Sequence, residues 1–223
     1  MAVPVALVDR LREVCGDEHV ITQKHQLATY ESDGLLHYAV TPGAVALPGD
    51  AREVQLAVQA CFEHRTPFVA RGAGSGLSGG ALPVADGIVI GLSRLRRVLE
   101  VDLANGRVVV EPGVTNVEVS KAVGPTHFYP PEPSSQIVCT IGGNVAENSG
   151  GAHCLKYGFT TNYVTAAEAV LPEGTFVQIG GPQADSPGYD LLGALVGTGT
   201  TRSVILVTTA SVPSEPTSAP SRS

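Results

Sequence analysis

Residues 67–80 read PFVARGAGSGLSGG, and this stretch decides the fold. Its first part, residues 67–70, is a short apolar run that predicts a strand. The run leads directly into five glycines, interleaved with serines, within residues 72–80. Glycine tolerates positive φ angles and leaves no side chain between the backbone and a ligand. The stretch therefore predicts a strand that leads into a loop able to approach a ligand closely.

The segment before this strand predicts a parallel crossover. Residues 44–48 form another short apolar run, closed by Pro-Gly-Asp, which indicates a strand. Asp50 then offers a helix N-cap with Glu53 three residues later, a capping box before an amphipathic helix. Strand, helix and strand in this order are typical of a parallel βαβ unit. Further upstream, the apolar spacing over residues 4–15 predicts a helix that ends at Gly16.

Beyond the glycine-rich loop several runs predict strands, and the second half of the chain is expected to be mostly antiparallel. The β-prone runs cover residues 87–92, 98–102, 107–111, 164–171, 175–179 and 204–207. Asn105-Gly106 lies between two of these runs and is the strongest short hairpin signal. Residues 116–122 predict a short helix. We therefore expect an α+β fold of two subdomains, residues 1–102 and 103–210, with a Ser/Pro-rich disordered tail over 211–223.

Composition narrows the class of protein. The 223 residues are 43% hydrophobic and 16% charged, which is typical of a globular chain. A net charge of −7 argues against a nucleic-acid surface, which needs basic residues opposite the phosphates. No apolar run reaches the roughly 18 residues of a membrane span, and the N-terminus resembles a helix start and not a secretion signal. The 4 cysteines lack CxxC spacing, so we expect reduced thiols and a cytoplasmic location.

The glycine-rich loop has three interpretations. Residues 74–79 match GxGxxG, but a Rossmann fingerprint must open a helix, and residues 80–87 contain a proline and no helical face. A tight turn is the plainest alternative. We favour a loop whose consecutive backbone N–H groups surround an anion such as a pyrophosphate. Ser75 and Ser78 would add hydroxyl donors, and Arg71 would anchor the loop or pair with phosphate.

A second constellation covers residues 130–158, which read PPEPSSQIVCTIGGNVAENSGGAHCLKYG. Its prolines stiffen an extended segment, Ser134 and Ser135 supply donors, and its two Gly-Gly pairs permit close approach to a flat ligand. The run fits neither a helix nor a strand template. An irregular surface loop is one interpretation, but so long a loop in a compact domain is more often functional.

Several other polar residues have ordinary interpretations. Metal ligation by Cys139, His153 and Cys154 is conceivable, but their spacing matches no zinc pattern, so we expect no metal. His127 and His37 are interpreted as ordinary loop histidines.

The two motifs, RGAGSGLSGG and PPEPSSQIVCTIGGNVAENSGGAHCLKYG, together closely resemble FAD-linked oxidases of the vanillyl-alcohol-oxidase/p-cresol-methylhydroxylase type. The nearest members are the FAD subunit of glycolate oxidase and D-lactate dehydrogenases, and the resemblance runs from about residue 30 to 197. It implies that FAD lies extended between two α+β subdomains. Some relatives attach FAD through a histidine of the first loop. Ser75 stands at the comparable position here, so the resemblance implies non-covalent FAD.

The resemblance also implies which residues bind the cofactor. For the pyrophosphate these are Arg71, Gly72, Ala73, Gly74, Ser75, Gly76, Ser78 and Gly79. Along the cofactor, and toward the ribityl chain and flavin, they are Pro133, Ser134, Ser135, Gly142, Gly143, Asn144, Ser149 and Gly150. His153, Lys156 and Tyr157 follow the flavin-side loop, and none is assigned as a base. The chemistry implied is hydride transfer from a D-2-hydroxy acid, such as glycolate or D-lactate, to FAD.

The resemblance stops abruptly after Gly197, where the family continues with a stretch like SEGTLGIVT that helps to enclose the adenine. Here residues 198–209 differ, and we expect a chain truncated before the second, substrate-binding domain, by a frameshift or an early stop. Three alternatives remain open: a fragment of a dehydrogenase, inactive alone; a flavin-binding subunit that needs an iron–sulfur or cap-domain partner chain; and a non-catalytic flavin-binding remnant.

Overall fold

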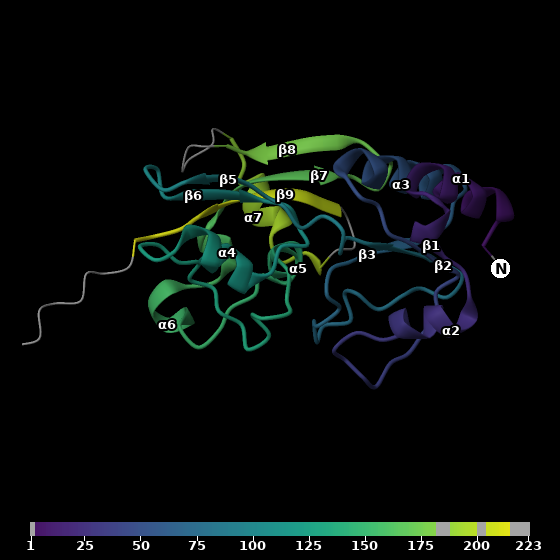
Figure 1. The fold of residues 1–223 in the computed structure, drawn as a ribbon, viewed down its shortest axis with the longest axis horizontal. Coiled ribbons are helices and arrows are strands. Elements are labelled where there is room, and N and C mark those ends of the chain that lie inside the picture. The colour runs from purple at the N-terminus through teal and green to yellow at the C-terminus, as the bar shows by residue number, and fades with distance from the viewer. Residues whose placement is uncertain (1–2, 182–187, 200–203, 215–223) are drawn as a thin grey trace, which may run out of the picture.

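The computed structural model describes residues 3–181, 188–199 and 204–214. It contains two β-sheets that lie side by side, each with helices against it (Figure 1). The predicted α+β class is confirmed. We call the part around the first sheet, residues 3–91, the first lobe, and the described residues from 98 onward the second lobe.

The first sheet has the strand order β1-β2-β4-β3. Its strands are β1 (Val20–Ile21), β2 (Ala44–Ala46), β4 (Ile88–Gly91) and β3 (Phe68–Arg71). β4 pairs in parallel with both β2 and β3, whereas β1 is antiparallel to β2. The predicted strands and the parallel crossover from β2 to β3 are therefore confirmed, with β4 inserted between these two strands.

Helix α3 (Ala51–Glu63) forms this crossover, and its start differs slightly from the expected capping box. The Asp50 carboxylate accepts the Glu53 N–H at 2.8 Å, as predicted. The Glu53 carboxylate, however, accepts the N–H of Gly49 at 2.6 Å. The reciprocal bond has moved one residue toward the N-terminus, and it still satisfies a backbone donor at the helix start.

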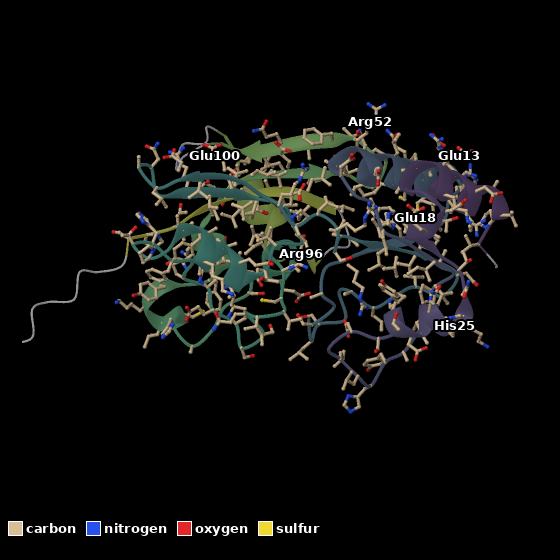
Figure 2. All side chains as sticks on the ribbon, viewed as in Figure 1. Glu13, Glu18, His25, Arg52, Arg96 and Glu100 are labelled. Atoms are coloured by element: carbon tan, nitrogen blue, oxygen red, sulfur yellow. The ribbon has the colours of Figure 1, made fainter. Side chains whose placement is uncertain are left out.

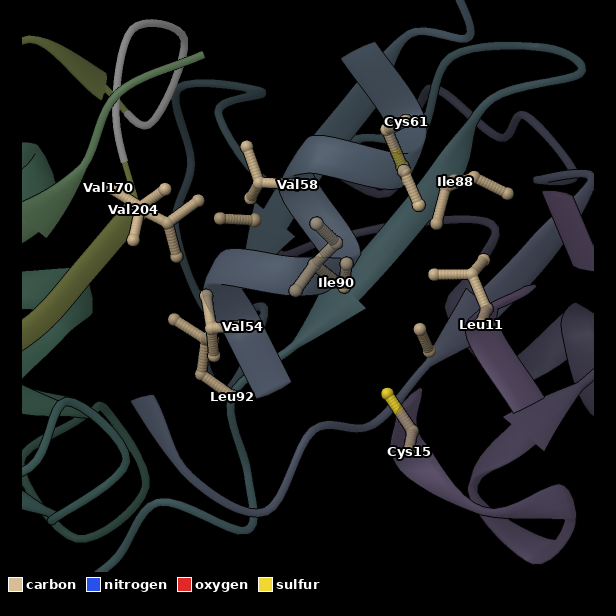
Figure 3. Packing of buried hydrophobic residues seen from close by; sticks show 14 of the residues in the cluster. Leu11, Cys15, Val54, Val58, Cys61, Ile88, Ile90, Leu92, Val170 and Val204 are labelled. Atoms are coloured by element: carbon tan, nitrogen blue, oxygen red, sulfur yellow. The ribbon is translucent and has the colours of Figure 1, made fainter. Parts of the chain in front are cut away.

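The core of the first lobe follows from the alternation of side chains along the strands. Ala44 and Ala46 of β2 face α3 and α1 (Val5–Cys15), while Val45 between them packs with Leu27 on the other side. Short helical turns occupy that second side: α2 (Lys24–Leu27) and η2 (Ala28–Tyr30), with η1 (Asp17–His19) after α1. Figure 3 shows Leu11, Val54 and Ile90 in the main core, which extends to Val170 and Val204 of the second lobe.

The second sheet has the order β5-β6-β9-β7-β8 and is antiparallel throughout. Its strands are β5 (Val98–Asp102), β6 (Arg107–Val110), β9 (Val204–Ser211), β7 (Val164–Val170) and β8 (Phe176–Gly180). The predicted hairpin joins β5 to β6, and Gly106 adopts a φ of 62° in its turn. This confirms the expected antiparallel character of the second half.

Helices pack on the second sheet and enclose a second core. They are α4 (Asn116–Val123), α5 (Ile141–Glu147) and α7 (Leu191–Leu195). The short turn η3 (Thr160–Asn162) contacts α5, and α6 (Cys154–Tyr157) has no buried residue. Val119 of α4 and Val145 of α5 pack with Val108 and Val110 of β6 in this core. The core holds α5 against the sheet, close to the first lobe (Figure 1).

Two expected boundaries shift. The division near residue 102 assigned β5 to the first subdomain, but β5 pairs with β6, so the chain passes between the sheets over residues 92–97. Arg97 fixes this passage, since its guanidinium donates to the buried Glu111 carboxylate at 2.7 Å and 3.0 Å. Figure 2 shows other polar side chains, including Arg52 and His25, on the outside.

The predicted disordered tail is wrong for its first four residues, 211–214. Ser211 is the last residue of β9, Val212 is buried, and Ser214 forms a bridge with His127. The apolar side chain of Val212 enters the second core, which explains why this part is ordered. The rest of the predicted tail, residues 215–223, lies outside the described residues.

Candidate functional site

The glycine loop, residues 72–80, follows β3 and does not open a helix, as expected: the described chain has no helix between β3 and β4. Gly74 and Gly79 have φ angles of 69° and 79°, which side chains rarely allow. The predicted need for glycine at these two positions is therefore confirmed. This geometry disfavours a Rossmann site, which requires a helix start at the loop.

Arg71 at the end of β3 anchors the glycine loop by contacts with backbone carbonyl groups. Its guanidinium is directed to the carbonyl oxygens of Tyr30 at 3.4 Å and Ala81 at 3.3 Å, and it lies over the Tyr30 ring. Burial lowers the Arg71 pKa from its usual value, while the charge of Asp33 opposes this effect. Of the two expected roles, anchoring the loop is the one that these contacts support.

The second motif contains a helix that the sequence did not predict. We expected residues 130–158 to form an irregular segment, but residues 141–147 form α5. Thr140 caps this helix by accepting the Gly143 N–H at 3.4 Å. Gly142 lies so close to Pro112 that an added Cβ would come within 2.6 Å of the Pro112 Cβ. Gly142 thus lets α5 pack tightly on Pro112, although glycine disfavours helices.

A cavity of about 240 Å³ separates the glycine loop from α5, so the loop and the second motif face one cleft. This confirms the expectation that Gly74 and Gly143 share a cleft. Nine of the sixteen predicted site residues line the cavity: Gly72, Ala73, Gly74, Ser75, Gly76, Ser135, Gly143, Asn144 and Ser149.

The other predicted site residues lie around this cavity without lining it: Arg71, Ser78, Gly79, Pro133, Ser134, Gly142 and Gly150. Arg71 and Gly142 border a small neighbouring cavity of about 20 Å³. Ser78 points to α5, where its hydroxyl donates to the Glu147 carboxylate at 2.6 Å. Gly150 faces Cys154 and Phe159 instead of the cleft, so its role here is close packing.

Sequence reasoning missed several lining residues: Ala70, Leu77, Gly80, Ala81, Cys139, Thr140, Ala146 and Glu147. The signal for Thr140 was available, because threonine directly before a helical segment is a common N-cap. It was overlooked because the segment was interpreted as a loop. Glu147 has no such signal, since its direction depends on how α5 is oriented.

Two buried amides form a chain behind the cavity wall. The Asn116 amide group donates to the Pro131 carbonyl at 2.6 Å, and the Asn144 amide group donates to the Asn116 Oδ1 at 2.6 Å. The Asn144 Oδ1 is buried and has no protein hydrogen-bond partner, and Asn144 lines the cavity. Because unsatisfied buried acceptors are costly, this atom suits a ligand with an N–H or O–H donor.

The polar residues of α6 form a separate cluster. His153 Nδ1 lies 2.8 Å from Glu132 Oε2, and the Lys156 ammonium donates to the Tyr157 hydroxyl at 2.8 Å. None of these four residues lines the cavity. Among the described residues, no three His, Cys, Asp or Glu side chains gather into a group that could hold a metal.

The cavity fits an extended nucleotide cofactor in its chemistry. Its glycine-rich wall presents backbone without side chains, its other wall offers an unpartnered amide oxygen and the Thr140 cap, and apolar residues lie between. Its volume is below the roughly 300–1,000 Å³ typical of whole small-molecule sites, so it encloses one portion of a long ligand.

Comparison with known proteins defines the class. The family described as "FAD binding domain" matches residues 42–180, which include the glycine loop and the second motif. The chain belongs to this family, and FAD is therefore its cofactor.

The relatives extend this assignment. The "Glycolate oxidase subunit GlcD" of Escherichia coli (strain K12) is 42% identical over 188 residues, covering 84% of this chain and 38% of that protein. The "D-lactate dehydrogenase" of Archaeoglobus fulgidus is 39% identical over 163 residues, covering 72% and 36%. The chain thus spans well under half the length of these relatives.

The fold is also that of a solved structure, an alkyldihydroxyacetonephosphate synthase, with a TM-score of 0.86 at 21% identity over 96% of this chain and 41% of that one. The predicted vanillyl-alcohol-oxidase type of fold is confirmed. In the described part of the chain, no helix combines the length and the apolar character that crossing a membrane requires.

Proposed function

We propose that the chain is the FAD-binding part of a flavin-dependent 2-hydroxy-acid dehydrogenase that oxidises glycolate or D-lactate. The observation that carries this proposal is the cavity of about 240 Å³ between the glycine loop and α5, within the sequence region shared with the glycolate oxidase subunit and the D-lactate dehydrogenase. When bound, FAD would supply the acceptor for a hydride from the α-carbon of the hydroxy acid.

The lining residues divide into two groups in this proposal. The backbone N–H groups of residues 72–76 hold the pyrophosphate, because consecutive amides favour an anion. Ser135, Gly143, Asn144 and Ser149 lie along the ribityl chain and the flavin. FAD binds without a covalent link, since the described lining contains no histidine and burial raises the pKa of the Cys139 thiol.

Groups for the substrate come from elsewhere in the assembly. A hydroxy acid carries a carboxylate, which proteins hold with arginine or lysine, and the described lining of the cavity contains neither. A further domain, or a separate chain that carries a cap or an iron–sulfur centre, supplies them. The name of the glycolate oxidase relative, which is a subunit, favours a partner chain.

We also propose a cytoplasmic location, which the free thiols support. Cys15, Cys61 and Cys139 are buried and unpaired, and Cys154 is also free, as expected of a protein in the reducing cytoplasm. We therefore place the protein there. Its net charge of −7 gives no support for a nucleic-acid partner.

The proposal is tested by binding and then by chemistry. The purified chain, titrated with FAD, should quench flavin fluorescence at one FAD per chain, and heat denaturation should release all the flavin into solution. The FAD-loaded chain is then mixed, without oxygen, with the second domain of a GlcD relative, and glycolate or D-lactate is added. Bleaching of the flavin absorbance supports the proposal. Tight FAD binding with no bleaching by either acid would contradict the assigned substrates.

A further inference from the structure

Glu147 is an ionisable side chain in the cavity that the assignment of the cofactor does not use. It is the last residue of α5 and lies half-buried in the cavity wall. Its carboxylate reaches across the cleft to the first lobe, where it accepts the Ser78 hydroxyl at 2.6 Å. A Cβ added to Gly80 would lie 2.8 Å from Glu147 Oε1, so the carboxylate lies directly against the backbone of the glycine loop.

Within the described part of the chain, no cation is paired with this carboxylate. None of the ion pairs formed by the described residues includes Glu147. Its position at the C-terminal end of a helix gives no favourable interaction with the helix dipole either. A carboxylate has about four acceptor positions, and the Ser78 hydroxyl fills one of them. Glu147 is therefore placed to accept further hydrogen bonds from neutral donors.

Two side chains of opposite charge contact the glycine loop. The Arg71 guanidinium lies next to Gly74, and a Cβ added to Gly74 would contact it. The Glu147 carboxylate, which lines the cavity as Arg71 does not, lies against Gly80 and 3.7 Å from the position of a Gly76 Cβ. A pyrophosphate is favoured near Arg71 and disfavoured near Glu147. The part of the cofactor beside Glu147 must therefore be uncharged and rich in donors.

In FAD the uncharged donors next to the pyrophosphate are the hydroxyls of the ribityl chain and of the adenosine ribose. We propose that Glu147 accepts hydrogen bonds from these sugar hydroxyls, and so positions the cofactor along the cleft. When the sugar is absent, the Ser78 hydroxyl donates its hydrogen bond to the same Glu147 carboxylate. This inference rests on the proposed function, because it requires that FAD binds in this cavity.

The experiment compares FAD binding to the full chain and its variants by fluorescence quenching. Glu147→Ala should weaken FAD binding about tenfold, the loss that corresponds to about 1.4 kcal/mol. Glu147→Gln should weaken it less, because its amide oxygen still accepts a hydrogen bond. Glu63→Gln is the matched control: Glu63 is exposed at the end of α3, and its variant should bind FAD like the wild type. Thermal unfolding of each variant without FAD checks that it is folded.

Smaller probes separate the roles of Glu147. Inorganic pyrophosphate has no hydroxyls, so Glu147→Ala should bind it as well as the wild type or better. A loss of affinity for FMN alone assigns the contact to the ribityl chain, and a loss for ADP alone assigns it to the ribose. If both Glu147 variants bind FAD as tightly as the wild type, or tighter, the carboxylate repels the cofactor and the proposal is overturned. An equal loss for pyrophosphate also overturns it, because Glu147 then only supports the loop. A wild-type chain that binds no FAD removes the proposed function itself.

Discussion

At the scale of single residues, Gly74 shows how one position controls the loop. Its φ of 69° is costly for any other residue, and the direction of its missing Cβ points to the Arg71 guanidinium. We expected a side chain at this position to block the anion directly. The structure gives a different reason: a side chain would displace the arginine that anchors the loop through Tyr30 and Ala81.

Gly74→Ala should therefore weaken FAD binding at least tenfold and lower the free energy of unfolding by about 1–3 kcal/mol, the typical cost of a strained backbone conformation. FAD titration and urea unfolding measure the two effects. Gly181→Ala is the control, since Gly181 has open space around its Cβ position and an ordinary φ. FAD binding by the Gly74 variant at wild-type strength would show that the loop does not hold the cofactor.

The cysteines provide a second prediction, which needs no cofactor. Burial raises the pKa of Cys61 to about 12 and contributes most to raising that of Cys15 to about 11. At pH 8 only about one Cys61 in ten thousand is the reactive thiolate. Ellman's reagent should therefore label one thiol quickly in the folded chain, the half-buried Cys154, and all 4 after unfolding. Rapid labelling of three or more thiols before unfolding would contradict the burial.

The same two thiols make stability depend on alkaline pH. In the unfolded chain the thiol pKa is near 9.0. Above that pH the unfolded chain releases protons that the folded chain, with its raised thiol pKa values, keeps. Their contribution is complete below pH 9.0 and is lost as the pH rises toward 11–12. Urea unfolding across this range should show a smaller pH-dependent loss for Cys61→Ala than for the wild type.

At the scale of elements, α5 marks the limit of what the sequence predicts. Helices α1 and α3 were predictable because their apolar residues repeat at helical spacing and stop at recognisable signals. The Gly-Gly pair at 142–143 lowers the helix propensity of α5, and packing on Pro112 and the second core stabilises the helix beyond what the Thr140 cap supplies. Such tertiary contacts leave no local pattern. The glycines of the site were therefore predictable, while Glu147 at the end of the same helix was not.

The buried amides connect α5 to α4, and they give a prediction for these elements. Asn116→Ala removes the donor to Pro131 and the acceptor for Asn144. Because buried polar groups then lose their partners, the free energy of unfolding should fall by about 1–3 kcal/mol. Urea unfolding measures the change. Asn105→Ala is the comparison, since its amide pairs with Asp102 at an exposed hairpin and should matter less. An equal or smaller loss for Asn116→Ala would contradict the role of the amide chain.

At the scale of the whole molecule, the two sheets place two distant motifs on one cavity. The resemblance of the two motifs to a known family made the fold and the shared cleft predictable. The first motif follows the end of β3, the second contains α5, and both line the cavity. The position at which the chain crosses from the first sheet to the second was not predictable, because β5 has the same apolar pattern whichever sheet it joins. The divergent stretch after Gly197, expected to weaken adenine binding, is described for residues 198–199 and for residues 204–209, which belong to β9, whereas residues 200–203 lie outside the described residues.

The composition of the cavity wall leads to the last prediction, which concerns activity. The only ionisable side chains in the described lining are Cys139 and Glu147. Neither attracts a carboxylate, and the net charge of −7 disfavours an anionic substrate further. Exposed apolar residues near the cleft, such as Leu77, which is 72% exposed, also leave it without a cover that excludes water. The chain alone should therefore bind FAD but position no hydroxy acid.

We expect the FAD-loaded chain by itself to show almost no turnover with glycolate or D-lactate and an artificial electron acceptor. Addition of the second domain of a GlcD relative should raise the rate, because that domain would supply the cations and the cover that this cavity wall lacks. The same mixture with the Gly74→Ala chain, which should hold little FAD, is the control and should stay inactive. Turnover by the chain alone at ordinary enzyme rates, on the order of 1–1,000 per second, would show that it carries a substrate site of its own.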